Sequence, residues 1–409
     1  MAIIKPFKAL RPQAQFAKQV ASKPYDVLSS AEAKKEAQGN PNSFLHITKS
    51  EIDLRENIDV HSDEVYEKAK DNLQAFIKRD ILFKENKECF YIYRLIMNNH
   101  TQTGLIAVSS VDDYDKNIIK KHEFTTPEKE LDRINHIEIT GAQTGNVFLA
   151  YRDNEELNDI IEKWAATKTA VYDFVTEDNV AHTLWIISDD KIIQQIINIF
   201  SSEIPHTYIA DGHHRAASAA KVRQSLDKKY PEADYFLTTL FPASQLQIMD
   251  YNRIIKTLNG LSAKTFLEEL KNDFVVEEKS LAYKPEMLHT FGLYLEGQWY
   301  KLSAKPHSFL NNELGVLDIN ILQNNVLSKH LGIYDQRTDK NIDFVGGIRG
   351  LNELEKRVNS GDYVMAFSLF PVSITQLFAI ADTNNVMPPK STWFEPKLRD
   401  GLVTHLIYE

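Results

Sequence analysis

Short apolar runs alternate along this sequence with segments whose apolar residues recur at helical spacing. Such spacing from Asp63 predicts an amphipathic helix that ends near Asp80. Apolar runs at 89–96 and 104–108 flank a polar stretch at 98–103, which predicts two antiparallel strands joined by a turn. Strands and helices in alternation predict a mixed fold, between α/β and α+β.

The alternation continues towards the middle of the chain. Thr126 precedes Pro127, with Glu128 and Glu130 in the next turn, and this pattern is typical of a helix start. Further elements are expected in this order: strand 146–151, helix 155–167, hairpin 170–187, helix 191–200, strand 207–210, helix 215–226, and strands 235–240 and 246–255.

Both ends of the chain are less regular. Residues 1–60 show no strong periodicity, and we expect short strands and ordered loops there. After about Asn259 the pattern restarts, so we expect two domains, a mixed α/β domain over 1–259 and an α+β domain over 260–409. The second is expected to contain helix 263–270, hairpin 292–301, helix 317–330, strand 342–345, helix 351–358 and strand 363–370.

Composition excludes several classes of protein. Apolar residues make up 43% and charged residues 25% of the 409 residues, as in ordinary globular chains. The net charge of −10 argues against a broad nucleic-acid surface. The only cysteine, Cys89, cannot form an intramolecular disulfide, and the start of the sequence lacks the apolar stretch of a signal peptide. No apolar run is long enough to span a membrane. We expect a cytoplasmic protein without a membrane partner, and the sequence leaves its oligomeric state open.

The segment that points to chemistry is a strand, a tight turn and a helix at 207–221. Gly212 follows Asp211 and permits a positive φ or a close backbone approach, and an alanine-rich stretch with strong helix propensity comes next. The first amides of a helix lack internal acceptors, so an anion bound there meets hydrogen-bond donors. Arg215 would add a two-pronged contact to a phosphate. We predict an anion site at this turn.

A plainer interpretation of the same turn stays open. Asp211 would cap the helix, and His213, His214 and Arg215 would form a solvated first turn. The crowding of four residues of catalytic type at one strand end favours a functional site over this alternative.

The turn also carries a family resemblance. YIADGHHRAASAA at 208–220 resembles the signature of the bacterial and archaeal family catalogued as domain of unknown function one thousand and fifteen. Further blocks of the chain resemble that family in the expected order, so the resemblance covers nearly the whole chain: KPYDV at 23–27, KHEFTTPEKELDR at 121–133, MDYNR at 249–253 and MPPKSTWFEPKL at 387–398.

A fainter resemblance links the turn to the ParB and sulfiredoxin superfamily, in which a Gly-x-x-Arg turn cradles nucleotide phosphates. Here those positions are Gly212 and Arg215. The resemblance implies a ParB/sulfiredoxin-like nucleotide-binding core with large elaborations. The superfamily includes DNA-partition CTPases, sulfiredoxin and free-serine kinases, so it implies a nucleotide without fixing the reaction. Sulfiredoxin chemistry needs a reactive cysteine, and Cys89 lies in an apolar strand instead.

A second polar segment precedes the helix that starts at Pro127. Lys121 would neutralise phosphate charge, and Glu123 or Asp132 would hold Mg²⁺ or accept a hydroxyl proton. The alternative is an exposed loop followed by a charged first turn. His122 and Glu123 together with the two turn histidines would instead supply ligands for a transition metal, although no His-x-x-x-His spacing supports this.

The stretch 390–397 near the C-terminal end has a composition suited to phosphate and a flat ring. We expect Lys390, Ser391, Thr392 and Lys397 to bind the cofactor, with the segment returning to the cleft of the first domain. The alternative is a strap whose Trp393 packs on the core. Tyr25, Asp26, Asn252 and Arg253 could approach the same cleft, or serve only as turn and strand-end residues.

These observations favour an enzyme that transfers a phosphoryl group to or from a small metabolite, with ATP or ADP and Mg²⁺ as cofactors. Asp211, His213, His214 and Glu123 are the expected catalytic residues, and the free-serine-kinase resemblance implies serine or phosphoserine as substrate. The direction of transfer stays open, so a metal-dependent phosphatase is an alternative. A nucleotide-binding regulatory module of ParB type ranks second, because no basic helix-turn-helix is expected. A non-catalytic scaffold ranks third.

Overall fold

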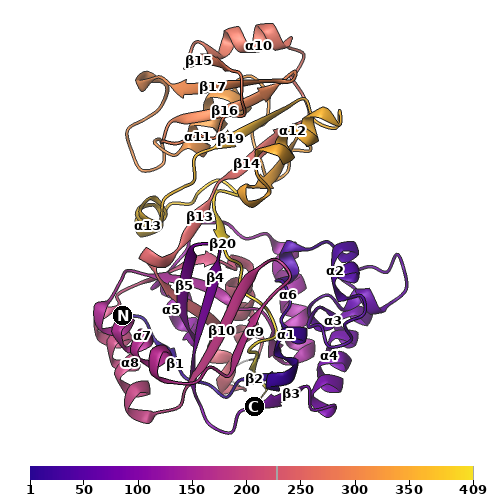
Figure 1. Ribbon diagram of the computed structural model, residues 1–409, viewed down its shortest axis with the longest axis vertical. Coiled ribbons are helices and arrows are strands. Elements are labelled where there is room, and N and C mark those ends of the chain that lie inside the picture. The colour runs from indigo at the N-terminus through magenta and orange to yellow at the C-terminus, as the bar shows by residue number, and fades with distance from the viewer. Residues whose placement is uncertain (227–228, 409) are drawn as a thin grey trace. The chain divides into compact units, whose positions relative to one another are not determined.

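The computed structural model describes residues 1–226 and 229–408. The chain divides into two compact units. The first unit comprises residues 1–121, 125–246 and 396–409, and the second comprises 122–124 and 247–395. Each unit has its own sheet and its own helices (Figure 1).

A nine-stranded mixed sheet forms the centre of the first unit. Its neighbours run in the order β6 (Ile119–Lys120), β11 (Thr207–Asp211), β8 (Val147–Tyr151), β12 (Tyr235–Pro242), β5 (His100–Ser110), β4 (Phe90–Met97), β10 (Val180–Ile187) and β9 (Tyr172–Val175), and β1 (Ile4–Lys5) pairs with β5. β8 runs parallel to β12 and antiparallel to β11, while β6 runs parallel to β11. The mixed α/β class that we predicted is confirmed.

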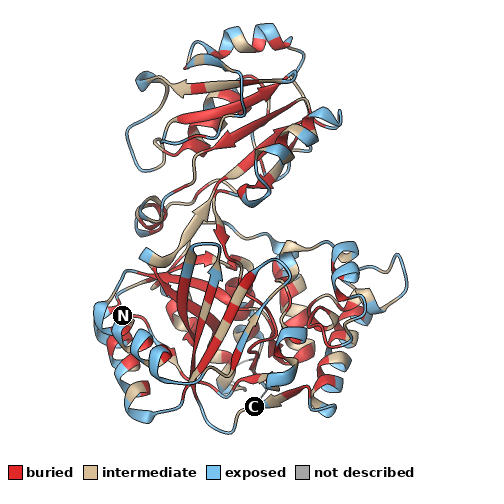
Figure 2. Cartoon of the chain, in the orientation of Figure 1, coloured by how far each residue is buried: buried red, intermediate tan, exposed pale blue. Residues whose placement is uncertain are grey.

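The helices of the first unit pack on this sheet and on one another. α7 (Glu155–Thr167) and α8 (Asp190–Glu203) contribute Ile161 and Ile196 to the sheet core, and α9 (His213–Ser225) contributes Ala216. α6 (Pro127–Thr140) packs on α9, and α4 (Asp63–Lys78) packs on α6. A short helix, α5 (Val111–Asp115), follows β5. The apolar strands are buried and the outer helix faces are exposed (Figure 2).

Strong periodicity predicted the long elements well. The helices expected from Asp63, Pro127 and Glu155 are confirmed, as is the hairpin at 170–187. β5 begins at His100, so the turn after β4 is shorter than the stretch 98–103 that we predicted. The expected helix 215–226 begins two residues earlier, at His213.

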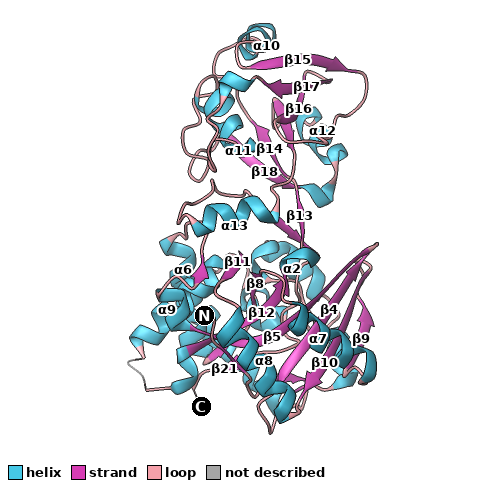
Figure 3. Cartoon of the chain, turned by 90° about the vertical axis from the view of Figure 1, so that its left-hand side faces the viewer, coloured by secondary structure: helices cyan, strands magenta, loops and turns pink. Residues whose placement is uncertain are grey.

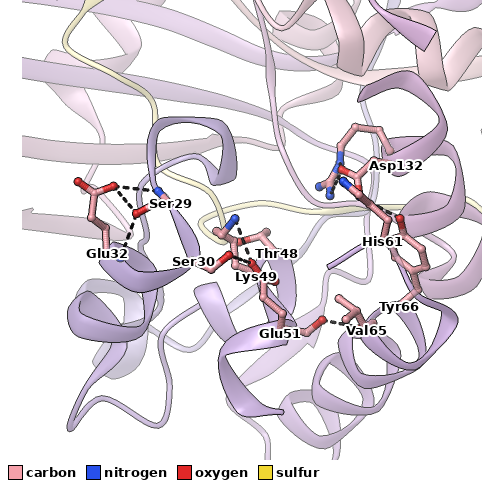
Figure 4. A network of polar contacts seen from close by, with 12 residues as sticks. Ser29, Ser30, Glu32, Thr48, Lys49, Glu51, His61, Val65, Tyr66 and Asp132 are labelled. Carbon is pink, nitrogen blue, oxygen red and sulfur yellow. Dashed lines mark hydrogen bonds and ion pairs between the residues drawn. The ribbon is translucent and has the colours of Figure 1, made fainter. Parts of the chain in front are cut away.

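The expectation of strands and loops for residues 1–60 is wrong in part. This region forms three short helices, α1 (Ala17–Val20), α2 (Ser30–Ala37) and α3 (Leu45–Thr48), besides β1 and β2 (Leu10–Pro12). Helices of four to eight residues are too short to show periodicity, so local contacts define them. α2 begins with a capping box between Ser29 and Glu32 (Figure 4).

An antiparallel sheet of six strands organises the second unit. Its order is β15 (Phe274–Lys279), β17 (Gln298–Ala304), β16 (Thr290–Leu295), β19 (Met365–Leu369), β14 (Tyr251–Ile255) and β18 (Ile342–Gly346). Its helices are α10 (Ala263–Leu270), α11 (Asp318–Leu322), α12 (Leu351–Asn359) and α13 (Ile374–Asp382), and α12 packs on β16 and β19.

Several expectations for this unit needed revision. The single strand expected at 246–255 is two strands, β13 (Gln247–Met249) and β14, separated at Asp250. The helix expected at 317–330 is α11 followed by a π-helical stretch at 323–328. β15 and α13 were not predicted.

Three two-stranded ladders complete the structure: β2 with β3 (Leu82–Lys84), β7 (Ala142–Gln143) with β21 (His405–Leu406), and β13 with β20 (Trp393–Glu395). Figure 3 shows the helices and strands in a second view. Within the described part of the chain, every helix is too short or too polar to cross a bilayer.

Gly104 in β5 provides a test of sheet packing in the first unit. A Cβ atom at this position would lie 2.7 Å from the ring of Phe241 on β12, and that ring packs on Phe148 at a centroid distance of 4.7 Å. Gly104→Ala should therefore lower the free energy of unfolding by about 1–3 kcal/mol, measured by urea denaturation. Thr101→Ala, at an exposed position of the same strand, should change it by about 0.5 kcal/mol or less. Equal effects of the two substitutions would contradict this packing.

Candidate functional site

The strand-turn-helix segment forms as the sequence predicts. β11 ends at Asp211, Gly212 adopts φ +96°, and α9 begins at His213. The N-cap residue of α9, Gly212, provides no side-chain cap, and a Cβ at Gly212 would lie 3.1 Å from the Arg215 guanidinium carbon. The turn therefore needs glycine both for its left-handed backbone and for the close approach of Arg215.

Arg215 turns inward from the first turn of α9. Its side chain is 8% exposed, Nη1 donates to the Asn146 carbonyl oxygen, and Nη2 lies 3.4 Å from carboxylate oxygens of both Asp26 and Asp211. Nε has no partner among the residues that the structure describes. Nη1 and Nη2 thus contact protein acceptors, and the role of Arg215 as a phosphate ligand stays a prediction.

Asp211 lies between two cations. Its Oδ2 is 3.3 Å from the Lys397 Nζ and 3.4 Å from Arg215, and its Oδ1 accepts a hydrogen bond from the Gly212 backbone N–H at 3.0 Å. Burial opposes ionisation, but Lys397 and Arg215 outweigh it and hold the pKa of Asp211 well below its usual range. This carboxylate is therefore ionised at neutral pH.

The two histidines of the turn differ in surroundings. His213 is buried, and its interaction with Asp211 lowers the pKa of that carboxyl. His214 accepts a hydrogen bond on Nε2 from the Thr126 backbone N–H at 3.1 Å, at the residue that precedes α6. A neutral His214 therefore carries its proton on Nδ1.

Lys121 and Asp132 have protein partners in the first unit. The Lys121 ammonium lies 3.7 Å from the centre of the Tyr114 ring, and burial lowers the pKa of Lys121. Asp132 Oδ1 accepts from Tyr66 at 3.0 Å and contacts His61 at 3.2 Å, as Figure 4 shows, and Oδ2 accepts from Arg133. Both oxygens of Asp132 are therefore engaged, which leaves this carboxylate poorly suited to the metal that we predicted for it.

The remaining predicted residues lie in the second unit, and their roles in the site stay predictions. Glu123 and His122 belong to its short stretch 122–124, and the loop with Lys390, Ser391 and Thr392 precedes β20. In that loop Lys390 has φ +56°, and Ser391 Oγ donates to the Pro388 carbonyl oxygen.

The C-terminal segment of the first unit brings in residues that sequence reasoning missed. Asp400 is 1% exposed, its Oδ2 has no partner in the described part of the chain, and burial raises the pKa of Asp400 to about 7 although Arg215 opposes the shift. Arg399, one position earlier, donates to Asp178. The sequence signal for Arg399 and Asp400 is the charge of the KLRD run at 397–400, in which only Lys397 is a predicted site residue.

A small cavity adjoins Arg215. Its volume is about 20 Å³, which is room for one water molecule. Its polar lining includes Tyr25, Arg133, Gln143, Thr144 and Arg215. The Arg133 guanidinium carbon lies 3.9 Å from the centre of the Tyr25 ring, so two of these lining residues form a cation–π contact.

Cys89 is free and buried, and burial raises the pKa of its thiol to about 11. A thiol of that pKa is protonated at neutral pH and is a poor nucleophile.

Comparison with known proteins gives one family. The family model described as "Protein of unknown function (DUF1015)" matches residues 4–321, well over half of the chain, so membership of that family is confirmed. The block at 387–398 lies outside the match, and its resemblance to the family stays a prediction. A search of the curated proteins finds no match.

Three solved structures illustrate the similar chains. A free serine kinase variant in complex with AMP is 14% identical, with 72% of this chain and 91% of that chain covered and a TM-score of 0.38. A conserved hypothetical protein from Pyrococcus furiosus is 16% identical, with 73% and 94% covered and a TM-score of 0.38. SbnI with a C-terminal truncation from Staphylococcus aureus is 11% identical, with 73% and 86% covered and a TM-score of 0.41.

Asp400 gives a pH prediction. Between its ordinary pKa of 3.8 and its folded-state pKa of about 7, the unfolded carboxyl is ionised while the folded one is protonated, so folding binds a proton and stability falls as pH rises. Asp400→Asn removes this loss. From about pH 4 to about pH 7, the free energy of unfolding of the variant should rise relative to wild type by about 1–4 kcal/mol. Parallel pH profiles in urea denaturation would show that Asp400 ionises normally.

Proposed function

The chain belongs to the family of proteins of unknown function DUF1015, and we propose that it is a phosphoryl-transfer enzyme that binds a phosphorylated small molecule at the first turn of α9. One observation carries the proposal: an ionised carboxylate, Asp211, ends β11 directly beside the N-terminus of α9, whose N-cap residue, Gly212, provides no side-chain cap. This arrangement puts an acceptor for a hydroxyl proton next to donors for phosphate oxygens.

The proposed phosphate site consists of the first backbone amides of α9 and the imidazole of His214. Gly212 lets the backbone turn without a side chain in the way, and the helix end favours negative charge. Because Nε2 of neutral His214 accepts from Thr126, its proton lies on Nδ1, and we propose that this N–H donates to a phosphate oxygen. Lys397, bound to Asp211, adds a cation on the same carboxylate.

Asp211 would orient the acceptor hydroxyl. Its low pKa makes it a weak base, which suits phosphoryl transfer because positioning and charge stabilisation contribute most of the catalysis there. Arg215 is then a positioning residue, since its Nη2 lies 3.4 Å from carboxylate oxygens of both Asp211 and Asp26.

Mg²⁺ with ATP or ADP is the proposed cofactor. An ionised carboxylate oxygen is a ligand that Mg²⁺ prefers. The Asp211 side chain is 29% exposed, so its carboxylate is accessible to a metal ion from solvent and suits this role. The metal would neutralise charge on the phosphates. Asp132 fits less well because both of its oxygens accept hydrogen bonds, and Glu123 stays a predicted ligand.

The proposed substrate is a small hydroxy compound in the cytoplasm. Serine is the first to test, because the sequence resembles the superfamily that includes free-serine kinases. Phosphoserine tests the reverse direction and the phosphatase alternative.

Asp211→Asn should lower the rate of Mg²⁺-dependent phosphoryl transfer between ATP and serine by about a hundredfold or more, because it removes the proposed proton acceptor. Phosphoserine and ADP formation, followed by ³¹P NMR, measure the rate. Asp112→Asn is the matched control, since Asp112 is partly exposed and pairs with Lys116 and Arg223 instead. Wild-type turnover by Asp211→Asn, or no turnover of serine, phosphoserine and other hydroxy compounds by wild type, would refute the proposal.

Lys397→Met tests the electrostatics of the site. Loss of this cation should raise the pKa of Asp211 towards its ordinary value, so the acid limb of the pH–rate profile should move to higher pH. Lys221→Met, on α9 but paired with Glu130, should leave the acid limb in place. An acid limb that moves equally in both variants would assign the effect to net charge alone.

A further inference from the structure

Four arginine side chains are buried among the residues that the structure describes, and one of them differs from the rest. Three have an aspartate partner: Arg133 with Asp132, Arg215 with Asp26 and Asp211, and Arg399 with Asp178. Arg253, in β14 of the second unit, is 0% exposed and has no described carboxylate within ion-pair distance.

Neutral oxygens surround the Arg253 guanidinium. Nη1 donates to the Tyr251 carbonyl, Nε to the Gln336 Oε1 at 3.3 Å, and Nη2 to the Pro389 carbonyl at 3.5 Å. The Phe344 ring lies 5.2 Å from the guanidinium carbon. A guanidinium has five N–H donors in a planar fork, so these three contacts leave donor capacity for an additional acceptor.

The acidic residue nearest in sequence does not neutralise this cation. Asp250 accepts from Asn252 Nδ2 at 2.6 Å and lies 3.3 Å from the Lys284 ammonium, so its charge is already compensated. Burial lowers the pKa of Arg253 to about 10, whereas the pKa values of Arg133 and Arg215 are raised by their partners. A buried cation without a counter-charge is costly, and proteins generally pair such groups.

We propose that Arg253 is the principal cationic ligand of an oxyanion site in the second unit. This site would bind the phosphate or carboxylate group of a small ligand. The Pro389 carbonyl, in the segment 388–391, makes the longest of the three contacts, so it is the acceptor that an oxyanion displaces. A charge-assisted, two-pronged contact then replaces a weak neutral one.

A second cation and two aromatic rings lie near the segment 388–391. Lys390 has φ +56°, a conformation that is rare for a residue with a side chain, and its ammonium lies 5.9 Å from the centre of the Tyr251 ring. Trp393 packs edge-on against the same ring at 5.1 Å. All of these residues belong to the second unit, so the inference does not depend on the proposed function of the turn before α9.

Hydrogen exchange of the full chain, measured by mass spectrometry, tests the site. Exchange in inorganic phosphate and exchange in acetate are each compared with exchange in chloride at equal ionic strength. At least one of the two oxyanions should slow exchange in residues 387–393 about threefold or more, and the anion that does so identifies the preferred group. Arg253→Met should abolish this protection. Asp211→Asn in the first unit should retain it, so failure of the turn site and failure of this site are distinguishable. Unchanged exchange in wild type with both anions, or protection that persists in Arg253→Met, would overturn the proposal.

A pair of matched variants keeps the test independent of folding. Arg399→Met leaves Asp178 without its cation, whereas Arg253→Met removes a cation that has no carboxylate partner. In the absence of added anion, the thermal midpoint of Arg253→Met should therefore fall less than that of Arg399→Met. An equal or larger fall for Arg253→Met would show that Arg253 is a structural hydrogen-bond donor, and would overturn the oxyanion site.

Discussion

The buried guanidinium of Arg215 is the interaction on which the geometry of the first unit's site depends. It contacts the Asn146 carbonyl just before β8, a carboxylate from the N-terminal region and the carboxylate that ends β11. Because Arg215 folds back towards the turn that precedes it, Gly212 cannot carry a side chain without a close contact. The same cation, with Lys397, keeps Asp211 ionised. The close packing at Gly212, the conformation of the turn and the ionised state of Asp211 therefore all depend on Arg215.

Local patterns predicted most of the fold. The helices from Asp63 and Glu155 and the hairpin that contains β9 and β10 have clear periodicity and turn residues, and all three are confirmed. The short helices of the first 60 residues were missed because four to eight residues define no period. The π-helical stretch after α11 was missed because its backbone departs from the regular helix that the residues favour.

The candidate site was predictable only at its centre. The strand, the glycine and the helix start are contiguous, so local chemistry pointed to Asp211 and His214 directly. Asp400 and the Arg133–Tyr25 stack come from distant segments, and only long-range packing brings such charges together. For Arg253 the sequence showed a strand-end arginine, and the missing counter-charge became visible only with the surrounding acceptors in place.

Phosphate binding at the first turn of α9 can be tested by a crystal structure of the chain with ADP and Mg²⁺. We expect phosphate oxygens about 2.7–3.2 Å from the backbone nitrogens of His213 and His214, with His214 Nδ1 directed at the same group. Well-ordered ADP whose phosphates contact other residues, with no phosphate oxygen at this turn, would contradict it.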